Sequence, residues 1–356
     1  MVTIRTALVL TACLALASCG TTYVAQAAKG QLQILTARKP ITKVLADPAA
    51  DAGLKQRLEV VREARSFAWR ELGLPNNKSY TSYADLKRDY VVWSVVATPE
   101  FSVAPREWCF PIVGCVAYRG YFKQAKAQKY ADKLRAEGFD TLVEGVPAYS
   151  TLGKFSDPVL SSMLRYGDDE LAATVFHELA HQLLYVRDDS AFNEAFATTV
   201  EDEGLRRWLE HQGTAARISE YRVEQAREER FVKLLAEARG RLARLYASSL
   251  SPGLLRERKA QEFAALADEI HAFEQRERVT YPLYDEWIKQ GLNNARLASV
   301  ATYYDCVPGF RKLLAQEGQD LSRFYEAARA LSKLPRGERH ARLCGATATV
   351  ADEAAD

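Results

Sequence analysis

The sequence predicts an α+β fold that is mostly α-helical, with one small mixed sheet in the first half of the chain. Segments rich in β-branched and aromatic residues lie within residues 90–155, whereas apolar residues recur at helical spacing through most of the rest. Residues 213–276 predict a long helical hairpin, with turn residues at 251–253. The 356 residues, 48% of them hydrophobic, allow one large domain or two small ones. We expect a single domain over residues 49–346, followed by a flexible tail, residues 347–356.

The N-terminus carries the pattern of an export signal. A short apolar run, residues 7–17, follows a basic residue and is too short for a typical membrane-spanning helix. It ends in Leu16-Ala17-Ser18-Cys19-Gly20, which resembles the bacterial lipobox. This resemblance implies a signal peptide over residues 1–18, lipidation of Cys19 and a membrane anchor through that lipid. An ordinary secretory signal cut nearby is the alternative.

The residue after the predicted lipidation site gives an expected location. Gly20 stands where inner-membrane lipoproteins carry aspartate, which implies lipid anchoring at the outer membrane of the bacterial cell envelope, facing the periplasm. Residues 19–48 are expected to form a tether that leads into the domain. The net charge is +2, from 48 basic and 46 acidic residues, so it gives no electrostatic reason to expect a nucleic-acid partner.

Four cysteines remain once Cys13 leaves with the signal peptide and Cys19 carries the lipid. They are Cys109, Cys115, Cys306 and Cys344. In an oxidising compartment an even number of cysteines indicates disulfides, and four cysteines allow three connectivities. We favour the local pairs, 109 with 115 and 306 with 344. A second zinc site is the alternative, disfavoured because no histidine lies near the first pair.

The segments before residue 160 alternate between helical and extended patterns. Residues 51–72 predict an amphipathic helix, which Gly73 and Pro75 end. The segments that follow are a strand at residues 90–97, a second candidate strand at residues 111–117, a polar helix at residues 121–137 and extended structure at residues 141–155.

Residues 168–203 carry the chemistry that the sequence predicts. Positions i and i+4 of a helix share one face, so His177 and His181 can close on a single metal ion. Glu178 projects beside them, where a metal-bound water would lie. An apolar stripe on the other side of this helix indicates burial of that side. We expect Asp168 to cap the helix.

A second helix follows a polar break in the chain. Ser190 is expected to cap it, and it runs to about residue 209. Glu194, near its start, is a plausible third ligand. Three protein ligands with one open position are typical of a catalytic zinc site rather than a structural one. The alternative is that the two histidines and the glutamate only decorate a helix surface, which Glu194 and the helical context disfavour.

Two further features suggest how a substrate would be handled. Peptidases often bind substrate as an added strand along a sheet edge, and the candidates for such a strand are Tyr149, Ser150, Thr151, Leu152 and Gly153. An ordinary interior or loop strand is the alternative. Within the helices expected over residues 281–333, the hydroxyls of Tyr303 and Tyr304 are candidate catalytic groups, since a hydroxyl near the metal could stabilise an oxyanion. Packing of these rings in the core is the alternative.

Together these motifs resemble those of the gluzincin metallopeptidases. The resemblance is closer still to a bacterial family of zinc aminopeptidases that are often lipoproteins, and it covers residues 51–331. It rests on the segment at residues 109–122, AYSTLG at 148–153, HELAHQ at 177–182, FNEAF at 192–196, and the Asn-Asn-Ala and Ala-Thr-Tyr-Tyr segments at 293–295 and 301–304.

The resemblance implies a zincin-like catalytic core that holds one Zn²⁺ ion and acts on peptide substrates. The implied ligands are His177, His181 and Glu194, and the implied catalytic carboxylate is Glu178. Twelve residues separate His181 from Glu194, fewer than is usual in the better-known gluzincins, which suggests a tighter helix-loop-helix. Asn193 and Glu201 are expected to support the ligands, with Glu201 orienting an imidazole.

The preferred function is therefore a zinc-dependent peptidase in which Glu178 is the general base toward a metal-activated water. Aminopeptidase specificity follows from the resembling family alone, since the sequence lacks the Gly-Ala-Met-Glu-Asn segment with which aminopeptidase-N-like enzymes hold a free α-amine. Two alternatives stay open. One is an endopeptidase that processes envelope proteins. The other is a non-catalytic zinc-binding lipoprotein with an assembly or chaperone role, against which the intact Glu178 argues.

Overall fold

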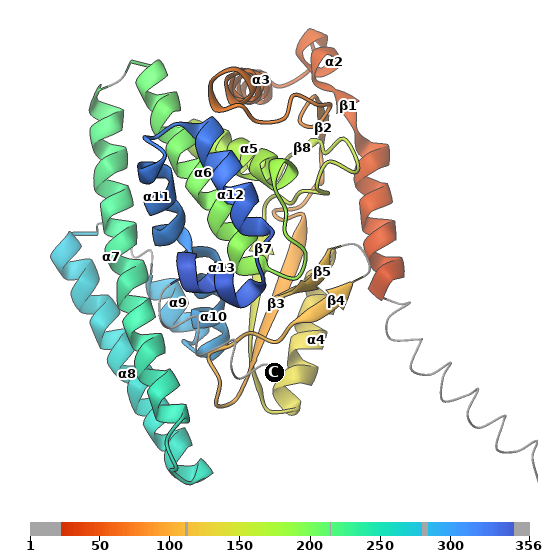
Figure 1. Cartoon of the computed structure of the whole chain (residues 1–356). Coiled ribbons are helices and arrows are strands. Elements are labelled where there is room, and N and C mark those ends of the chain that lie inside the picture. Colours follow the sequence, from red (N-terminus) through yellow and green to blue (C-terminus); the bar gives the residue numbers. More distant parts are fainter. Residues whose placement is uncertain (1–22, 111–112, 214, 280–283, 345–356) are drawn as a thin grey trace, which may run out of the picture.

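The computed structural model describes residues 23–110, 113–213, 215–279 and 284–344. The expected signal peptide at residues 1–18, Cys19 and the expected tail at residues 347–356 lie outside them. The described chain is mostly helical with three small sheets, which agrees with the predicted α+β class. A long helical hairpin lies along one side and the N-terminal helix along the opposite side (Figure 1). None of the described helices is both long enough and apolar enough to cross a lipid bilayer.

The part of the predicted tether that the structure describes, from residue 23 on, is folded. Residues 23–37 form a helix, followed by β1 (Lys39–Pro40) and α2 (Ile41–Ala46). Tyr23 stacks on Phe110 and contacts Tyr121 edge to face. These partners are distant in sequence, so the sequence alone did not reveal that the segment is held against the domain.

The first long helix agrees with the prediction. α3 (Ala52–Leu72) is capped by Asp51, whose carboxylate accepts a hydrogen bond from the backbone nitrogen of Leu54. Gly73 ends the helix with a φ of 67°, a left-handed conformation that glycine adopts without strain. The buried face of α3 packs against the helix that carries the histidines.

The central sheet is antiparallel, with the order β6-β3-β7. Its strands are β3 (Val92–Pro99), β6 (Arg119–Tyr121) and β7 (Phe139–Val146). Neighbouring residues of a strand face opposite sides, so Val95 and Ala97 pack toward α4 (Gln124–Ala136) and Val96 toward α10 (Asn294–Tyr304). The sheet is therefore a layer with one helix on each face, as Figure 1 shows.

Two smaller sheets complete the β-structure. The sheet β1-β2-β8 is mixed, because β1 runs antiparallel and β8 runs parallel to β2. The other is a hairpin, β4-β5, in which Cys109 and Cys115 lie opposite each other and form a disulfide. The strands are β2 (Ser82–Ala84), β4 (Trp108–Phe110), β5 (Gly114–Val116) and β8 (Val159–Leu160).

Several predictions for this part of the chain differ from the structure, and the limits of β3 and β7 are shifted by about two residues or more from those expected. The expected single mixed sheet is divided into three sheets. The strand expected at residues 111–117 is the shorter β5, and residues 111–112 lie outside the described chain. The helix expected from residue 121 begins at Gln124, because Tyr121 still pairs with Trp93 in the central sheet. Strand limits depend on partners that are distant in sequence, which local patterns do not show.

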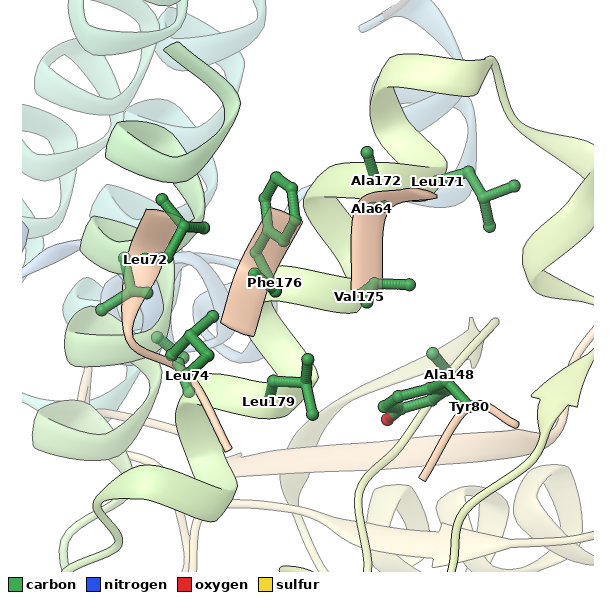
Figure 2. Packing of buried hydrophobic residues seen from close by; sticks show 14 of the residues in the cluster. Ala64, Leu72, Leu74, Tyr80, Ala148, Leu171, Ala172, Val175, Phe176 and Leu179 are labelled. Atoms are coloured by element: carbon green, nitrogen blue, oxygen red, sulfur yellow. The ribbon is translucent and has the colours of Figure 1, made fainter. Parts of the chain in front are cut away.

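The main core holds the site helices from one side. It joins α3 to α5 (Asp168–Leu183), which follows the short 3₁₀ turn η1 (Met163–Arg165), and to α6 (Ser190–His211). In Figure 2, Phe176 and Leu179 of α5 lie next to Leu72 and Leu74. Full burial of one such side chain contributes about 1.5–3 kcal/mol. The apolar face of α5 is thus fixed by packing, which leaves its other face for polar groups.

The predicted hairpin is present as α7 (Ala215–Tyr246) and α8 (Pro252–Glu277), which has its own apolar core around Phe231 and Phe273. The other helices of the C-terminal part are α9 (Asp285–Gln290), α11 (Val307–Gln316), α12 (Leu321–Ser332) and α13 (Arg336–Leu343). A second disulfide, Cys306–Cys344, joins the start of α11 to the end of α13. The structure thus contains both locally paired disulfides.

Asp189 is a buried junction between the site helices and α13. Its carboxylate accepts a hydrogen bond from the backbone nitrogen of Phe192 and so caps α6. It also accepts hydrogen bonds from Nε and Nη2 of Arg339, at 3.0 and 2.8 Å, and from Nε2 of His340 at 2.9 Å. Burial alone would raise the pKa of Asp189, but His340 and Arg339 lower it below its ordinary value.

We expect Asp189→Ala to lower the free energy of unfolding by about 3–5 kcal/mol near neutral pH, because the charge of the buried Arg339 loses its partner. The pKa of Asp189 is lowered in the folded state, so its contribution is present above the unfolded pKa of about 3.9 and disappears as the pH falls through the folded pKa. The difference in the free energy of unfolding between wild type and variant, measured by urea denaturation, should therefore be large near neutral pH and much smaller in strong acid. An undiminished difference in strong acid would contradict this assignment.

Candidate metal centre

Both site helices begin with caps other than those the sequence suggested. Gly167 precedes α5, and Asp168 is the first helical residue, where it forms an ion pair with Arg57 of α3 instead of capping. Asp189, rather than Ser190, caps α6. Each cap lies one residue earlier than expected. At α6 the reason is that Arg339 and His340 of α13 hold Asp189 in place.

Asn193 fixes the turn between α5 and α6. Its Oδ1 accepts a hydrogen bond from the backbone nitrogen of Val186, and its Nδ2 donates to the carbonyl oxygen of the same residue, both at 2.7 Å. The side chain thus satisfies both backbone groups of one residue in a buried turn. Glu194 follows directly, so its position relative to α5 depends on this clamp.

The side chains of His177, His181 and Glu194 converge on one point. The two Nε2 atoms lie 3.1 Å apart, and each lies 3.5 Å from Oε2 of Glu194. Atoms that bind one tetrahedral ion at about 2.0–2.1 Å are separated from each other by about 3.3 Å. The three side chains therefore have the spacing of ligands to a common ion and could hold a metal.

Glu201 contacts the outer nitrogen of one imidazole. Its Oε2 accepts a hydrogen bond from Nδ1 of His177 at 2.8 Å. A proton on Nδ1 leaves Nε2 with a lone pair that points toward His181 and Glu194. This is the contact expected of a residue that orients a ligand imidazole.

In this cluster, burial and neighbouring charges shift the pKa values in opposite directions. Burial alone would lower the pKa of His177, but Glu194 and Glu201 raise it well above its ordinary value. Burial alone would raise the pKa of Glu194, but the two imidazoles lower it to about 2. The buried carboxylate is therefore stabilised only by positive charge at the imidazole nitrogens, and a divalent cation at their meeting point would supply such charge directly.

Glu178 lies beside the cluster in a different environment. Glu178 is only 7% exposed, and its Oε2 has no hydrogen-bond partner among the described residues. Burial raises the pKa of Glu178 to about 7, and the nearby imidazoles lower it only in part. A carboxyl group with a pKa near neutrality can both accept and return a proton.

The cluster opens onto a cavity of about 2220 Å³ that the four residues His177, Glu178, His181 and Glu194 help to line. One wall comes from the N-terminal helix and β7, and the opposite wall from α7, α9 and α10. Figure 1 shows α5 and α6 between these walls. Sites for small molecules typically enclose about 300–1,000 Å³, so this cavity has room for a segment of polypeptide.

The expected substrate strand is not a strand. The residues Tyr149, Ser150, Thr151, Leu152 and Gly153 follow the end of β7 as irregular chain and a turn, and all of them except Gly153 line the cavity. Leu152 and Gly153 have φ angles of 56° and 73°, which an extended strand does not contain. Asp157 holds this turn, since it accepts hydrogen bonds from N and Oγ1 of Thr151 at 2.9 and 2.7 Å. β7, which ends just before these residues, is one of the two edge strands of the central sheet.

The two candidate tyrosines of α10 differ in their surroundings. Both line the cavity. The charge of Glu194, together with burial, raises the pKa of Tyr303 well above its ordinary value, which places Tyr303 beside the ligand cluster. The hydroxyl of Tyr304 donates to Oε1 of Glu228 on α7 at 2.5 Å. Tyr303 is therefore the better placed of the two to meet a substrate at the cluster.

Three tyrosines near the cluster were missed at the level of sequence. Tyr118 and Tyr185 line the cavity, and burial together with the charge of Glu194 raises the pKa of each, to about 12 for Tyr185. Tyr80 lies in the core, where burial and then the charge of Glu178 raise its pKa. Tyr80 and Tyr118 come from segments far from the histidine motif, and no spacing rule connects them to it.

The family comparison agrees with this geometry. A family model described as "Putative aminopeptidase" matches residues 22–343. The chain belongs to this aminopeptidase family. Comparisons with curated proteins and with solved structures give no match. The family match includes the N-terminal helix that lines the cavity, and membership in an aminopeptidase family indicates peptide substrates.

We expect the chelator-stripped protein to bind one divalent ion, and Glu201→Ala to weaken that binding by about 10- to 100-fold, because His177 loses the acceptor that orients it. His181→Ala should weaken it further, since a ligand is removed. Isothermal titration calorimetry with Zn²⁺ measures both effects. Glu224→Ala is the matched control, because Glu224 lies on α7 and lines the cavity without contacting the cluster. Unchanged affinity in His181→Ala would rule out this site.

Proposed function

We propose that this member of the aminopeptidase family is a zinc-dependent aminopeptidase with a zincin-like catalytic core. The observation that carries the proposal is the convergence of three ligand atoms beside one buried carboxyl group, Glu178, whose Oε2 lacks a partner among the described residues. Two imidazole nitrogens and one carboxylate oxygen suit a catalytic zinc ion. A structural zinc site would use a fourth protein ligand, and the described residues provide a group of three.

In the proposed reaction, Glu178 and Tyr303 have separate roles around the peptide bond that is cleaved. When bound, a zinc ion would lower the pKa of a water molecule and polarise the substrate carbonyl. Glu178 is placed to accept a proton from an attacking water and to return it to the leaving amine, and its pKa of about 7 would suit both transfers. The hydroxyl of Tyr303, beside Glu194, is suited to donate to the carbonyl oxygen as negative charge develops there.

The charge of the cavity supports cleavage next to a free amino terminus. Among the described residues that line it, ten are Asp or Glu and four are Lys or Arg, although the whole chain has a net charge of +2. A cavity with this excess of carboxylates attracts cationic groups such as an α-ammonium. Its size also admits an internal segment of polypeptide, so an envelope endopeptidase is the second candidate.

A non-catalytic zinc lipoprotein is disfavoured by Glu178. Burying a carboxyl group without a hydrogen-bond partner costs stability. A purely structural site has no use for such a group, whereas a general base needs one that is free to accept a proton. The unpaired Oε2 therefore favours the catalytic function.

We expect Glu178→Gln to keep the bound metal and to lose nearly all turnover, because the amide cannot accept the proton while the ligands are unchanged. The measurement combines metal content with cleavage of a peptide library whose members carry either free or acetylated N-termini. Wild type should cleave the free peptides and leave the acetylated ones intact. Cleavage of acetylated peptides would instead support the endopeptidase, and full activity in metal-loaded Glu178→Gln would refute the assigned role.

We also propose that the protein acts in the bacterial cell envelope, lipid-anchored through Cys19 at the outer membrane and facing the periplasm. The lipobox-like sequence that ends at Gly20 supports this location. The disulfides Cys109–Cys115 and Cys306–Cys344 also support it, because such bonds persist in oxidising compartments. Peptides in the periplasm would be the substrates within reach.

We expect Cys19→Ala in the full chain to shift the protein from the membrane fraction to the soluble fraction, because the side chain that carries the lipid is removed. Fractionation of cells, followed by mass spectrometry of the N-terminal peptide, measures both the location and the modification. Cys13→Ala is the control, since that cysteine lies inside the predicted signal peptide. An unmodified N-terminus in wild type would contradict the proposal.

A further inference from the structure

Three exposed apolar side chains lie at the rim of the catalytic cavity. Val24, Leu32 and Phe155 are 54%, 61% and 49% exposed, and all three line the cavity. They are three of the eight large hydrophobic side chains that are exposed in the described chain, and the other five do not line it. Single exposed apolar side chains are ordinary, whereas a group of them beside a site indicates contact with a ligand or partner.

Two of these side chains belong to an apolar side of the N-terminal helix, residues 23–37. The members of this side line the cavity and are spaced by four, four and three residues: Val24, Ala28, Leu32 and Leu35. Ile34 lies on a different side of the helix, where it is buried in the main core. A surface helix ordinarily has polar residues on the sides that do not pack on the core. The second apolar side therefore indicates a ligand in the cavity.

Hydrogen bonds hold the N-terminal helix in place at the rim. The side-chain amide of Gln26 donates to the carbonyl oxygen of Gly120 and accepts from the backbone nitrogen of Phe122, both at 3.3 Å. Just beyond the other end of the helix, Nη1 of Arg38 donates to the carbonyl oxygen of Ser156 at 2.9 Å. The helix is thus fixed to the central sheet and to the chain that follows the turn at residues 149–155. Its apolar side is presented to the cavity without rearrangement.

The opposite wall of the cavity differs in charge. α7 and α9 contribute four glutamates to its lining: Glu220, Glu224, Glu228 and Glu286. The two arginines of α7 in the lining are paired with carboxylates, in the ion pairs Arg217–Asp169 and Arg227–Glu224. None of the cavity-lining residues of helix 23–37, all of them in the described chain, is charged. A cationic group is therefore favoured toward α7, and an apolar group toward the N-terminal helix.

The difference between the walls gives a bound peptide a direction. α5 and α6, which carry the ligand cluster, lie between the two walls (Figure 1). In an aminopeptidase only one residue precedes the cleaved bond, so nearly all of the peptide lies on the leaving-group side. With the α-ammonium drawn toward the acidic wall, the leaving-group part extends along the apolar wall. From Val24 to Leu35 the helix is about 17 Å long, the length of about five extended residues.

We propose that the N-terminal helix and Phe155 form the subsite for the leaving-group part of the substrate, and that this subsite selects peptides with apolar side chains in the first positions after the cleaved bond. Such side chains would cover Val24, Leu32 and Phe155 and so remove exposed apolar surface from water. This substrate preference deepens the proposed peptidase function and rests on it for the direction in which the peptide binds.

The affinity of metal-loaded Glu178→Gln for peptides, measured by isothermal titration calorimetry, tests the subsite without turnover. The probes are an octapeptide with a free amino terminus and leucines at positions 2 to 4, and its analogue with glutamines there. The leucine peptide should bind about 10-fold more tightly, and adding Leu32→Gln should remove most of this difference, because the apolar contact is lost. Leu254→Gln is the matched control, since Leu254 of α8 is 45% exposed and does not line the cavity. That control should keep the full preference.

Equal affinity for the two peptides, or a preference that survives Leu32→Gln, would overturn the subsite. A preference that follows a leucine at position 1 alone would overturn the assigned direction. If Leu32→Gln weakens binding of the unlipidated protein to phosphatidylglycerol vesicles and leaves peptide affinity unchanged, the apolar side contacts a membrane surface and the proposal fails. If wild type cleaves no peptide, the proposed function fails, while the affinities still decide whether the N-terminal helix selects apolar peptides.

Discussion

The double hydrogen bond between Asn193 and the backbone of Val186 is the constraint on which the site depends. It sets the spacing of two helices, and that spacing decides whether Glu194 reaches the imidazoles of α5. Asp189, a few residues earlier, connects the same turn to α13 through Arg339. A disulfide then ties the end of α13 to α11. The C-terminal helices therefore stabilise the ligand geometry although none of the three ligands comes from them.

Packing and polar chemistry are divided between the two sides of α5. On one side, Phe176 and Leu179 are buried in the main core (Figure 2), and this burial supplies the stability that the polar side lacks. On the other side, the cluster contains carboxyl groups and imidazoles that are largely removed from water. Their charges stabilise one another only while Glu194 stays close to both histidines. A small change in the turn would therefore have two unfavourable effects. It would separate the ligands, and it would leave Glu194 buried without its partners.

The histidine motif and the long helices were predictable because the information is local. The i, i+4 spacing places His177 and His181 on one face, and the apolar stripe of α5 is buried as its period indicates. The sheets, the fold of residues 23–37 and the true caps depend on partners distant in sequence. Asp189 caps α6 because Arg339 and His340 fix it there, which no local pattern shows. Tyr80 is the extreme case, since the position of its loop depends on hydrogen bonds from Gln182 to Ser79 and from the backbone of Tyr80 to Asp157.

Two of the six non-glycine residues with left-handed φ angles in the described chain lie in the loops around the catalytic cluster. Tyr80 and Leu152 have left-handed φ angles of 60° and 56°. Each lies in a loop that forms hydrogen bonds with Asp157. The backbone oxygen of Asp157 binds the nitrogen of Tyr80, while its carboxylate binds Thr151. One buried residue thus joins the loop behind Glu178 to the turn that lines the cavity. Such a connection keeps both segments rigid before a substrate arrives, and a site that is already ordered does not lose catalytic efficiency to reorganisation during the reaction.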